Sequence, residues 1–340
     1  MTYKQSLEHI LAGNDLNHAD MLAITQQVMS GELTPAQIAG FLIALRVKTE
    51  SVDEITAAAT VMRALSTKVE IKDKTHLIDT CGTGGDGIQT FNVSTASAFV
   101  AAAAGAKVAK HGGRSVSSTC GSADVLEALG VNVNLTPAQV AKSVAEIGIG
   151  FMFAPNHHSA MKHSAPVRRE LGVRTLFNLL GPLTNPAEAH RQVMGVFNKD
   201  LTLKLAKVLQ NLGSEHVLVV HGADGMDEIS FTGDTFVAEL KDGKMTEYTL
   251  NPAQFDMPLH DLKRIKVENA EQSKAMILDV LAGKSHTQNS AARDIVLLNA
   301  GAAIYVAGLQ ANIHAGIAHA ATMIDTGEAL AKLEALKAIK

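Results

Sequence analysis

The residues that follow Thr80 are the first in this sequence whose types and spacing indicate chemistry. The stretch CGTGGDG, residues 81–87, holds four glycines and Asp86 directly after an apolar, β-prone run. Glycines let successive backbone N–H groups point at one anion. A helix start is predicted just beyond, where free N–H groups and the helix dipole favour negative charge. Its hydroxyl and amide groups come from Asn92, Ser94 and Thr95. This loop therefore predicts an anion-binding site.

The same loop also fits the pattern G-x-G-x-x-G of dinucleotide-binding proteins, but its context differs from theirs. That fingerprint needs a helix directly after the third glycine and an acidic residue about 20 positions later. Here IQTF intervenes, and the next predicted strand ends in Lys110 and His111. A P-loop would need lysine after the last glycine, where this sequence has Ile88. A purely structural turn is disfavoured because each glycine costs about 0.5–1 kcal/mol in chain entropy.

A second loop with anion-binding residues spans 109–124, AKHGGRSVSSTCGSAD. It carries cations and several hydroxyls, which suit a phosphate ester. A solvated basic turn would explain the segment equally well if it stood alone. It follows a predicted strand one β–α unit beyond the first loop, and this position favours a phosphate-binding role.

Two further segments carry charged residues that suit a substrate and a metal. Asp227 and Glu228 follow the predicted strand VLVVHG, and adjacent carboxylates there suit Mg²⁺ bridging to phosphates. An ordinary acidic turn is the alternative. In APVRRELGVR, Arg168 and Arg169 diverge by about 100° on a helix, so at most one faces a site. An arginine there would pair bidentately with a carboxylate, which indicates an acidic organic co-substrate.

Composition narrows the class of protein. The chain has 340 residues, of which 46% are apolar and 19% charged, as in globular proteins. Its net charge of −4, without a basic stripe, argues against a nucleic-acid partner. No run approaches the roughly 20 apolar residues of a membrane span, so we expect no membrane association. With two cysteines, Cys81 and Cys120, we expect a reducing compartment, the cytoplasm.

The pattern of apolar residues divides the chain into two parts. Residues 1–70 show helical spacing, with helix starts at Thr34-Pro35 and at the capping box of Ser51 and Glu54. Beyond residue 75, β-prone runs alternate with helices, which is typical of an α/β domain. We predict a small all-helical domain plus a larger α/β domain with a mostly parallel central sheet flanked by helices. The helical domain is expected over 1–72, completed by an inserted helical segment at about 165–190, and the α/β domain over 73–340.

With these four segments in view, the sequence resembles the anthranilate phosphoribosyltransferase family, which is related to pyrimidine nucleoside phosphorylases. The resemblance rests on DTCGTGGDGIQTFNVSTAS, AKHGGRSVSSTCGSADVLEALG, APVRRELGVRTLFNLLGPLTNPA and GADGMDEIS, in this order. It implies transfer of the phosphoribosyl group from 5-phosphoribosyl 1-pyrophosphate to the amine of anthranilate, in tryptophan biosynthesis. It also implies a homodimer formed through the helical domain.

The resemblance assigns roles position by position. Contacts to phosphoribosyl pyrophosphate are implied for Gly82, Gly85, Asp86, Thr90, Asn92, Val93, Ser94, Thr95, Lys110, His111, Gly112, Gly113, Arg114, Ser115, Val116, Ser117, Ser118 and Ser122. Contacts to anthranilate are implied for Gly82, Gly113 and Arg168. Mg²⁺, as two ions bound with the pyrophosphate, would be held by Ser94, Asp227 and Glu228. No catalytic base is required, and His111 is the fallback proton acceptor.

One position departs from the family pattern. The usual K-H-G-N-R reads Lys110-His111-Gly112-Gly113-Arg114 here, so the asparagine side chain is missing. We expect altered acceptor affinity and an intact phosphate-binding role, because the latter rests on backbone groups, serines and cations. Two other functions stay open at this point. A nucleoside phosphorylase would carry a further C-terminal domain, and a nucleic-acid-binding relative would have a basic face and degraded loops.

Overall fold

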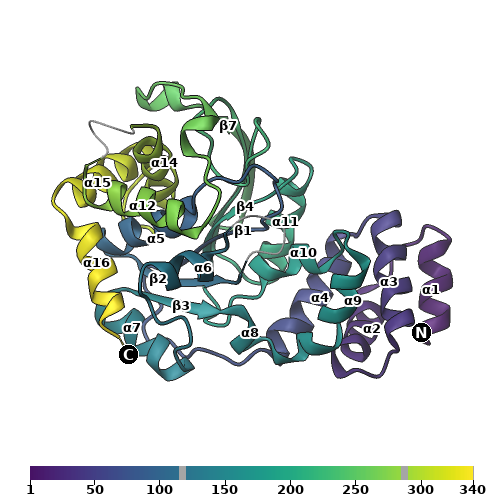
Figure 1. Cartoon of the computed structure of the whole chain (residues 1–340). Helices are drawn as coiled ribbons and strands as arrows, with labels where there is room; N and C mark the ends of the chain where they lie inside the picture. Colours follow the sequence, from purple (N-terminus) through teal and green to yellow (C-terminus); the bar gives the residue numbers. More distant parts are fainter. Residues whose placement is uncertain (115–119, 285–289, 340) are drawn as a thin grey trace.

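The computed structural model describes residues 1–114, 120–284 and 290–339. Four of the residues expected to bind phosphate lie outside the described residues: Ser115, Val116, Ser117 and Ser118. The described part forms a helical region joined to a larger region built on one sheet (Figure 1). This arrangement confirms the predicted fold class.

The helical region begins with four helices, α1 Tyr3–Leu11, α2 His18–Ser30, α3 Pro35–Lys48 and α4 Val52–Leu65. Both predicted caps form, and in α4 Ser51 N donates to Glu54 Oε2 at 2.8 Å while Glu54 N donates to Ser51 Oγ at 3.2 Å. Three short helices from later in the chain pack on this region (Figure 1): η1 Ser159–His163, α9 Ala165–Leu171 and α10 Phe177–Leu180. The domain division at residues 72 and 73 stays a prediction; it falls between α4 and the first strand.

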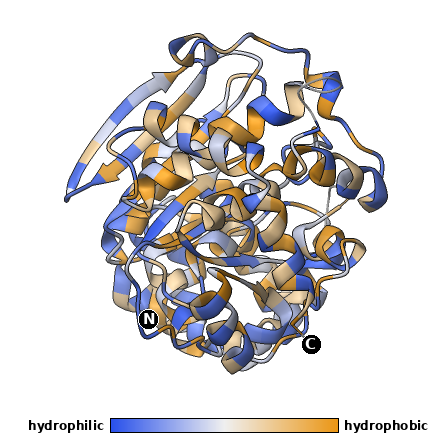
Figure 2. Ribbon diagram, turned by 90° about the vertical axis from the view of Figure 1, so that its left-hand side faces the viewer, coloured by the Kyte–Doolittle hydropathy of each residue, from blue (hydrophilic) through white to orange (hydrophobic). Residues whose placement is uncertain are grey.

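The sheet has seven strands in the order β3-β2-β1-β4-β5-β6-β7, of which the first five in this order are parallel. The last two are antiparallel, and Figure 2 shows their hairpin at the edge of the molecule. The strands span Leu77–Gly82, Lys107–Gly112, Ile149–Phe153, Arg191–Gly195, His216–Gly222, Thr235–Lys241 and Lys244–Leu250, numbered β1 to β7 along the chain. The sequence patterns had indicated neither β4 nor β7.

Alternating residues of the strands face opposite layers, as the two-residue period of a strand requires. In β5, Leu218 and Val220 join the core formed with α5 Val93–Ala103 and α14 Ser290–Val306. Val217 and Val219 join the core that extends through α11 Leu201–Asn211 into the helical region. Helices therefore cover both faces, and the interdomain packing is continuous with the core of the sheet.

The remaining helices surround this frame. They are α6 Ser122–Ala128, α7 Pro137–Ile147, α8 Ala154–His157, η2 Gly181–Leu183, η3 Pro252–Phe255, η4 Leu262–Ile265, α12 Ala270–Leu281, α15 Ile313–Asp325 and α16 Glu328–Lys337. Among the described residues, no helix is both long and apolar enough to cross a lipid bilayer. Both cysteines are free thiols.

Candidate active site

The strand order reverses direction between β1 and β4, and this point defines the site. From β1 the chain adds β2 and β3 on one side, and then returns to add β4 and β5 on the other. In open α/β sheets, ligands bind at the carboxyl ends of the strands at such a switch point. Gly82 ends β1 and pairs with Gly195, which ends β4. The glycine loop predicted from the sequence therefore begins at the switch point.

Asp227 fills the space above these two glycines. A Cβ atom at Gly195 would overlap the carbonyl oxygen of Asp227, and one at Gly82 would collide with its carboxylate. Only glycine allows the acidic loop to approach the strand ends this closely. Gly195 thus has a role in the site that no local pattern in the sequence indicated.

The glycine loop bends back toward the acidic residues. Gly84, Gly85 and Gly87 have φ angles of 63°, 79° and 75°, in the left-handed region that favours glycine. The backbone N–H of Gly84 donates to Asp227 Oδ2 at 2.8 Å. The Asp86 carboxylate accepts from the N–H of Ile88 at 3.1 Å, which stabilises the turn. The loop and the acidic pair, 143 positions apart, thus meet in one site.

The start of α5 lies against the second acidic residue. Ser94 N donates to Glu228 Oε1 at 3.1 Å, and Ser94 Oγ accepts from Lys110 Nζ at 3.2 Å. Asn92 does not cap the helix with its side chain. Instead its amide donates to Cys120 O at 3.1 Å and its Oδ1 accepts from Ser273 Oγ at 2.7 Å. Asn92 therefore connects the donor side of the site to α12 and to the second loop.

The other predicted residues of this segment occupy less direct positions. Thr90 forms an isolated backbone bridge with Lys266. Val93 is buried in the core. Thr95 is buried too, and within the described part of the chain its Oγ1 has no hydrogen-bond partner. Their predicted contacts to the donor stay predictions.

The two carboxylates repel each other and Asp86. Burial and the neighbouring Asp86 raise the pKa of Asp227 to about 7. Burial and Asp227 raise the pKa of Glu228 well above its ordinary value. A divalent cation would relieve this repulsion, so the residues fit Mg²⁺. Within the described ranges, no group of three or more His, Cys, Asp or Glu side chains is placed to hold a metal ion. An ion at the acidic pair would need further ligands, such as phosphate oxygens and water.

Lys110 extends from β2 toward the same point. Its ammonium donates to Thr80 O as well as to Ser94 Oγ, so it lies between β1 and α5. Burial lowers the pKa of Lys110, while the nearby Asp79 opposes that shift. The two hydrogen bonds of this lysine fix its side-chain nitrogen beside the acidic pair.

The rest of the second loop is only partly described. Gly112 packs against Ser122, the first residue of α6, so the two predicted residues lie side by side. Gly113 has open space around the position of a Cβ atom and no positive φ. Arg114 is exposed and pairs with Asp124 at 2.9 Å and with Glu127 at 2.6 Å. Its guanidinium therefore already has carboxylate partners in this structure.

His111 faces His158, a residue to which the sequence patterns assigned no role. Their ring centroids are 5.1 Å apart, and within the described residues the Nε2 atom of each is buried without a hydrogen-bond partner. Burial, with His158 next, lowers the pKa of His111 well below its ordinary value, and burial lowers the pKa of His158 to about 4. Both rings are neutral near pH 7 and offer unpaired nitrogen atoms. Neighbouring His157 instead binds Thr67 O at 2.9 Å in the interdomain linker.

Arg168 projects from α9 on the helical side. Its guanidinium lies 5.3 Å from the centroid of the Phe177 ring, and it is half-buried, whereas Arg169 is exposed. This difference agrees with the expectation that only one of the two faces a site. Burial lowers the pKa of Arg168, which remains charged. The contact with Phe177 holds the guanidinium against the helical region, and its predicted contact with anthranilate stays a prediction.

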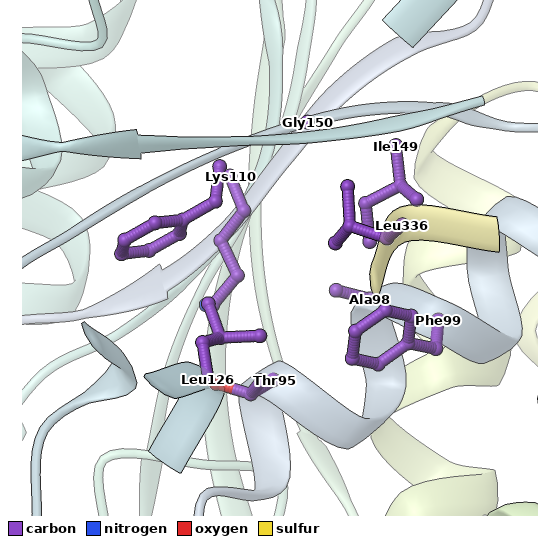
Figure 3. Close-up of a pocket in the computed structure, with 9 residues that line it drawn as sticks. Thr95, Ala98, Phe99, Lys110, Leu126, Ile149, Gly150 and Leu336 are labelled. Carbon is purple, nitrogen blue, oxygen red and sulfur yellow. The ribbon is translucent and has the colours of Figure 1, made fainter. Parts of the chain in front are cut away.

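A small cavity lies behind the strand ends and is not the substrate site. It has a volume of about 10 Å³ and is lined mainly by apolar side chains of α5, α6, β3 and α16, together with Thr95 and Lys110 (Figure 3). This volume is about that of one water probe. A cavity of this size is too small for a sugar diphosphate or an aromatic acid.

Comparisons with known proteins agree with this geometry. Residues 74–330 match the model of the glycosyl transferase family α/β domain, and residues 4–66 match that family's helical bundle domain. The chain is thus a member of this glycosyl transferase family, a class of group-transfer enzymes.

Individual relatives narrow the family further. The anthranilate phosphoribosyltransferase of Methylobacillus flagellatus is 65% identical over all of this chain and 98% of its own length. The crystal structure of the Thermus thermophilus enzyme is 40% identical, has a TM-score of 0.92 and covers 98% of both chains. The Saccharomyces cerevisiae enzyme in complex with phosphoribosyl pyrophosphate and Mg is 29% identical, with a TM-score of 0.89, over 98% of this chain and 96% of that one. The chain belongs to the anthranilate phosphoribosyltransferase family.

Proposed function

We propose that the two strand-end loops and the acidic pair carry out the reaction that this family membership assigns to the chain. The phosphoribosyl group of 5-phosphoribosyl 1-pyrophosphate moves to the amine of anthranilate, giving N-(5-phosphoribosyl)anthranilate and pyrophosphate. The assignment of the site rests on one observation, a set of hydrogen bonds at the switch point of the sheet. Gly84 N donates to Asp227, Ser94 N donates to Glu228, and Ser94 Oγ accepts from Lys110. Anion-binding N–H groups, a cation and a metal-binding pair thereby surround one position.

The chemistry is a single displacement at the anomeric carbon. The C–O bond to pyrophosphate breaks as the aromatic amine attacks from the opposite face, so the configuration inverts, as in other single displacements at a sugar. Backbone N–H groups of the glycine loop and the start of α5 would stabilise the charge that grows on the leaving oxygens. In this structure the N–H groups of Gly84 and Ser94 donate to Asp227 and Glu228. Holding the amine and the anomeric carbon close together in the orientation for attack supplies much of the remaining rate acceleration.

Asp227, Glu228 and the Ser94 hydroxyl would hold Mg²⁺, and we propose two ions bound with the pyrophosphate. When bound, the ions supply charge stabilisation for the leaving group. The anilinium formed by attack is acidic enough to release its proton to water or to the substrate carboxylate. His111 remains the fallback acceptor, since its neutral ring has an Nε2 atom without a partner among the described residues.

A quaternary arrangement and a cellular location are also proposed for this protein. We propose a homodimer through the helical domain, which carries exposed apolar side chains at Leu11 and Val47. Sedimentation equilibrium measures this directly, and a monomer at all concentrations would reject it. Free cysteines agree with a cytoplasmic protein.

The activity is tested with the purified chain, donor, Mg²⁺ and anthranilate. Anthranilate fluorescence is expected to change only when all components are present. Thymidine phosphorolysis and salt-dependent binding of single-stranded DNA are measured in parallel. Turnover in the phosphorolysis assay alone would contradict the proposed reaction, and binding of DNA without turnover would favour a nucleic-acid-binding protein.

Replacing Arg168 by alanine is expected to raise the KM for anthranilate by about 10- to 150-fold, since charge-assisted hydrogen bonds contribute about 1.5–3 kcal/mol. The KM for the donor should stay within about twofold, because the arginine is assigned to the acceptor. Steady-state kinetics with each substrate varied in turn checks this. Arg169→Ala is the matched control, as this neighbour is exposed. An equal rise in both KM values would reject the role of Arg168.

Replacing Gly113 by asparagine is expected to lower the KM for anthranilate by about 2- to 10-fold, the effect of one hydrogen bond of about 0.5–1.5 kcal/mol. The side chain should fit, because a Cβ atom there meets nothing within 4 Å and φ is not positive. Kinetics and thermal unfolding measure the two effects. Gly113→Ala adds the Cβ atom without the amide, so equal KM values in both variants would contradict the prediction.

A further inference from the structure

The buried carboxylate of Asp79 has no assigned part in the reaction, yet it joins two functional segments. Asp79 lies on β1, is 1% exposed and accepts a hydrogen bond from the backbone N–H of His111 at 3.2 Å. Its other oxygen accepts from Asn185 Nδ2 at 2.8 Å. The same Asn185 nitrogen donates to Ala109 O at 2.9 Å. One carboxylate and one amide thus bind the backbone of the residues directly before and after Lys110.

Asn185 belongs to the segment that returns the chain from the helical region to the sheet. This segment, residues 181–187, lies across β1 and β4. Gln192 of β4 donates to Pro182 O at 2.7 Å, and Arg63 of α4 donates to Leu183 O at 2.7 Å. The Asn185 side chain also accepts from Ala187 N at 2.9 Å, which fixes its orientation. The segment therefore contacts α4 at one end and Asp79 at the other.

A buried carboxylate of this kind is costly unless it is fully hydrogen-bonded. Burial raises the pKa of Asp79, and the ammonium of Lys110 opposes that shift. Two hydrogen bonds accepted by the carboxyl oxygens offset this cost. Their donors are a backbone N–H at the tip of β2 and the side-chain amide of Asn185 in the interdomain segment.

We infer that Asp79 is a positioning residue for the donor site. It orients the end of β2, Lys110–Gly112, and through Asn185 it fixes the position of this strand end relative to the interdomain segment. The inference rests on the proposed function, since that strand end is assigned to the donor. A backbone shift of about 1 Å in such a loop can cost about a hundredfold in rate.

The test uses two single variants and their combination. In Asp79→Asn the new amide meets a donor, either His111 N or Asn185 Nδ2, so one bond is lost. In Asn185→Asp two carboxylates face each other. In the double variant, the amide at position 79 accepts from His111 N and donates to the carboxylate at position 185. The bridge between positions 79 and 185 then forms again with reversed polarity. In both variants that carry Asn185→Asp, the carboxylate faces Ala109 O without a hydrogen bond, so this loss cancels when the two are compared.

Asp79→Asn is expected to reduce kcat/KM for the donor by about tenfold to a hundredfold, with the KM for anthranilate within about twofold. The double variant should recover at least about fivefold over Asn185→Asp, the coupling expected for residues in contact. Amide hydrogen exchange at residues 110–112 should be faster in Asp79→Asn. This readout needs no turnover, so it tests the positioning even if the wild-type chain proves inactive on anthranilate.

Glu54→Gln is the matched control, because Glu54 is a fully buried carboxylate that accepts from Leu16 N at 2.9 Å in the helical region. It should lower the thermal midpoint without changing the donor KM. The inference is overturned if Asp79→Asn lowers only the thermal midpoint, as Glu54→Gln does, and leaves donor kinetics and exchange at 110–112 unchanged. It is also overturned if the double variant is no better than Asn185→Asp.

Discussion

Replacing Asp227 by asparagine and Glu228 by glutamine together is expected to reduce Mg²⁺-dependent transfer by about a thousandfold. A bound divalent ion contributes several kcal/mol of charge stabilisation to the leaving group, and each 1.4 kcal/mol corresponds to about tenfold in rate. The amides keep the volume of the acids, and the amide at position 227 still offers an oxygen to the N–H of Gly84. The loss therefore reports the metal-binding charge and not a collapsed loop.

The measurement is the initial rate as a function of Mg²⁺ concentration, at saturating donor and anthranilate. We expect the remaining activity to require much more Mg²⁺ than the wild type, because a neutral amide is a weaker ligand. Asp242→Asn is the control: this aspartate lies at the exposed turn between β6 and β7, with φ of 51°, a conformation that asparagine tolerates. Wild-type rates in the double variant would remove the acidic pair from the site.

Replacing Gly195 by alanine is expected to lower kcat/KM by about a hundredfold. The new methyl group would overlap the carbonyl oxygen of Asp227, so the acidic loop would have to move as a unit. Backbone atoms cannot yield as a flexible side chain does, and a displacement of about 1 Å in a positioned group can cost that much in rate. Crowding of this kind also destabilises a fold by about 1–3 kcal/mol.

Kinetics and thermal unfolding of the same preparation separate these effects. The donor and the metal requirement should both be affected, because Asp227 contacts the glycine loop through Gly84. Gly233→Ala is the control, since a Cβ atom there meets nothing within 4 Å and φ is not positive. If Gly195→Ala were as active and as stable as Gly233→Ala, the close approach of the acidic loop to β4 would not matter to catalysis.

The sequence determined the local structure of this protein to a large extent. The helix starts at Thr34 and Ser51 form the predicted caps, because capping depends on residues within one turn. The glycine loop has the left-handed backbone that its composition implies. Alternation of β-prone and helical runs was enough to predict the α/β class, and four ordered motifs were enough to indicate the family.

The tertiary structure alone decided how these parts meet. β4 is five residues long and begins with Arg191 and Gln192, so its period resembles no strand template, yet it pairs with both β1 and β5. Its pairing sets the switch point and places Gly195 under Asp227. The contact of His111 with His158, and the bridge from Asp79 to Asn185 across 106 positions, likewise depend on strand order. The physical reason is the distance along the sequence between the residues that interact. Caps and turns depend on neighbouring residues, whereas this site depends on hydrogen bonds and packing between strand ends that are far apart in the sequence, which the local pattern of residues does not show.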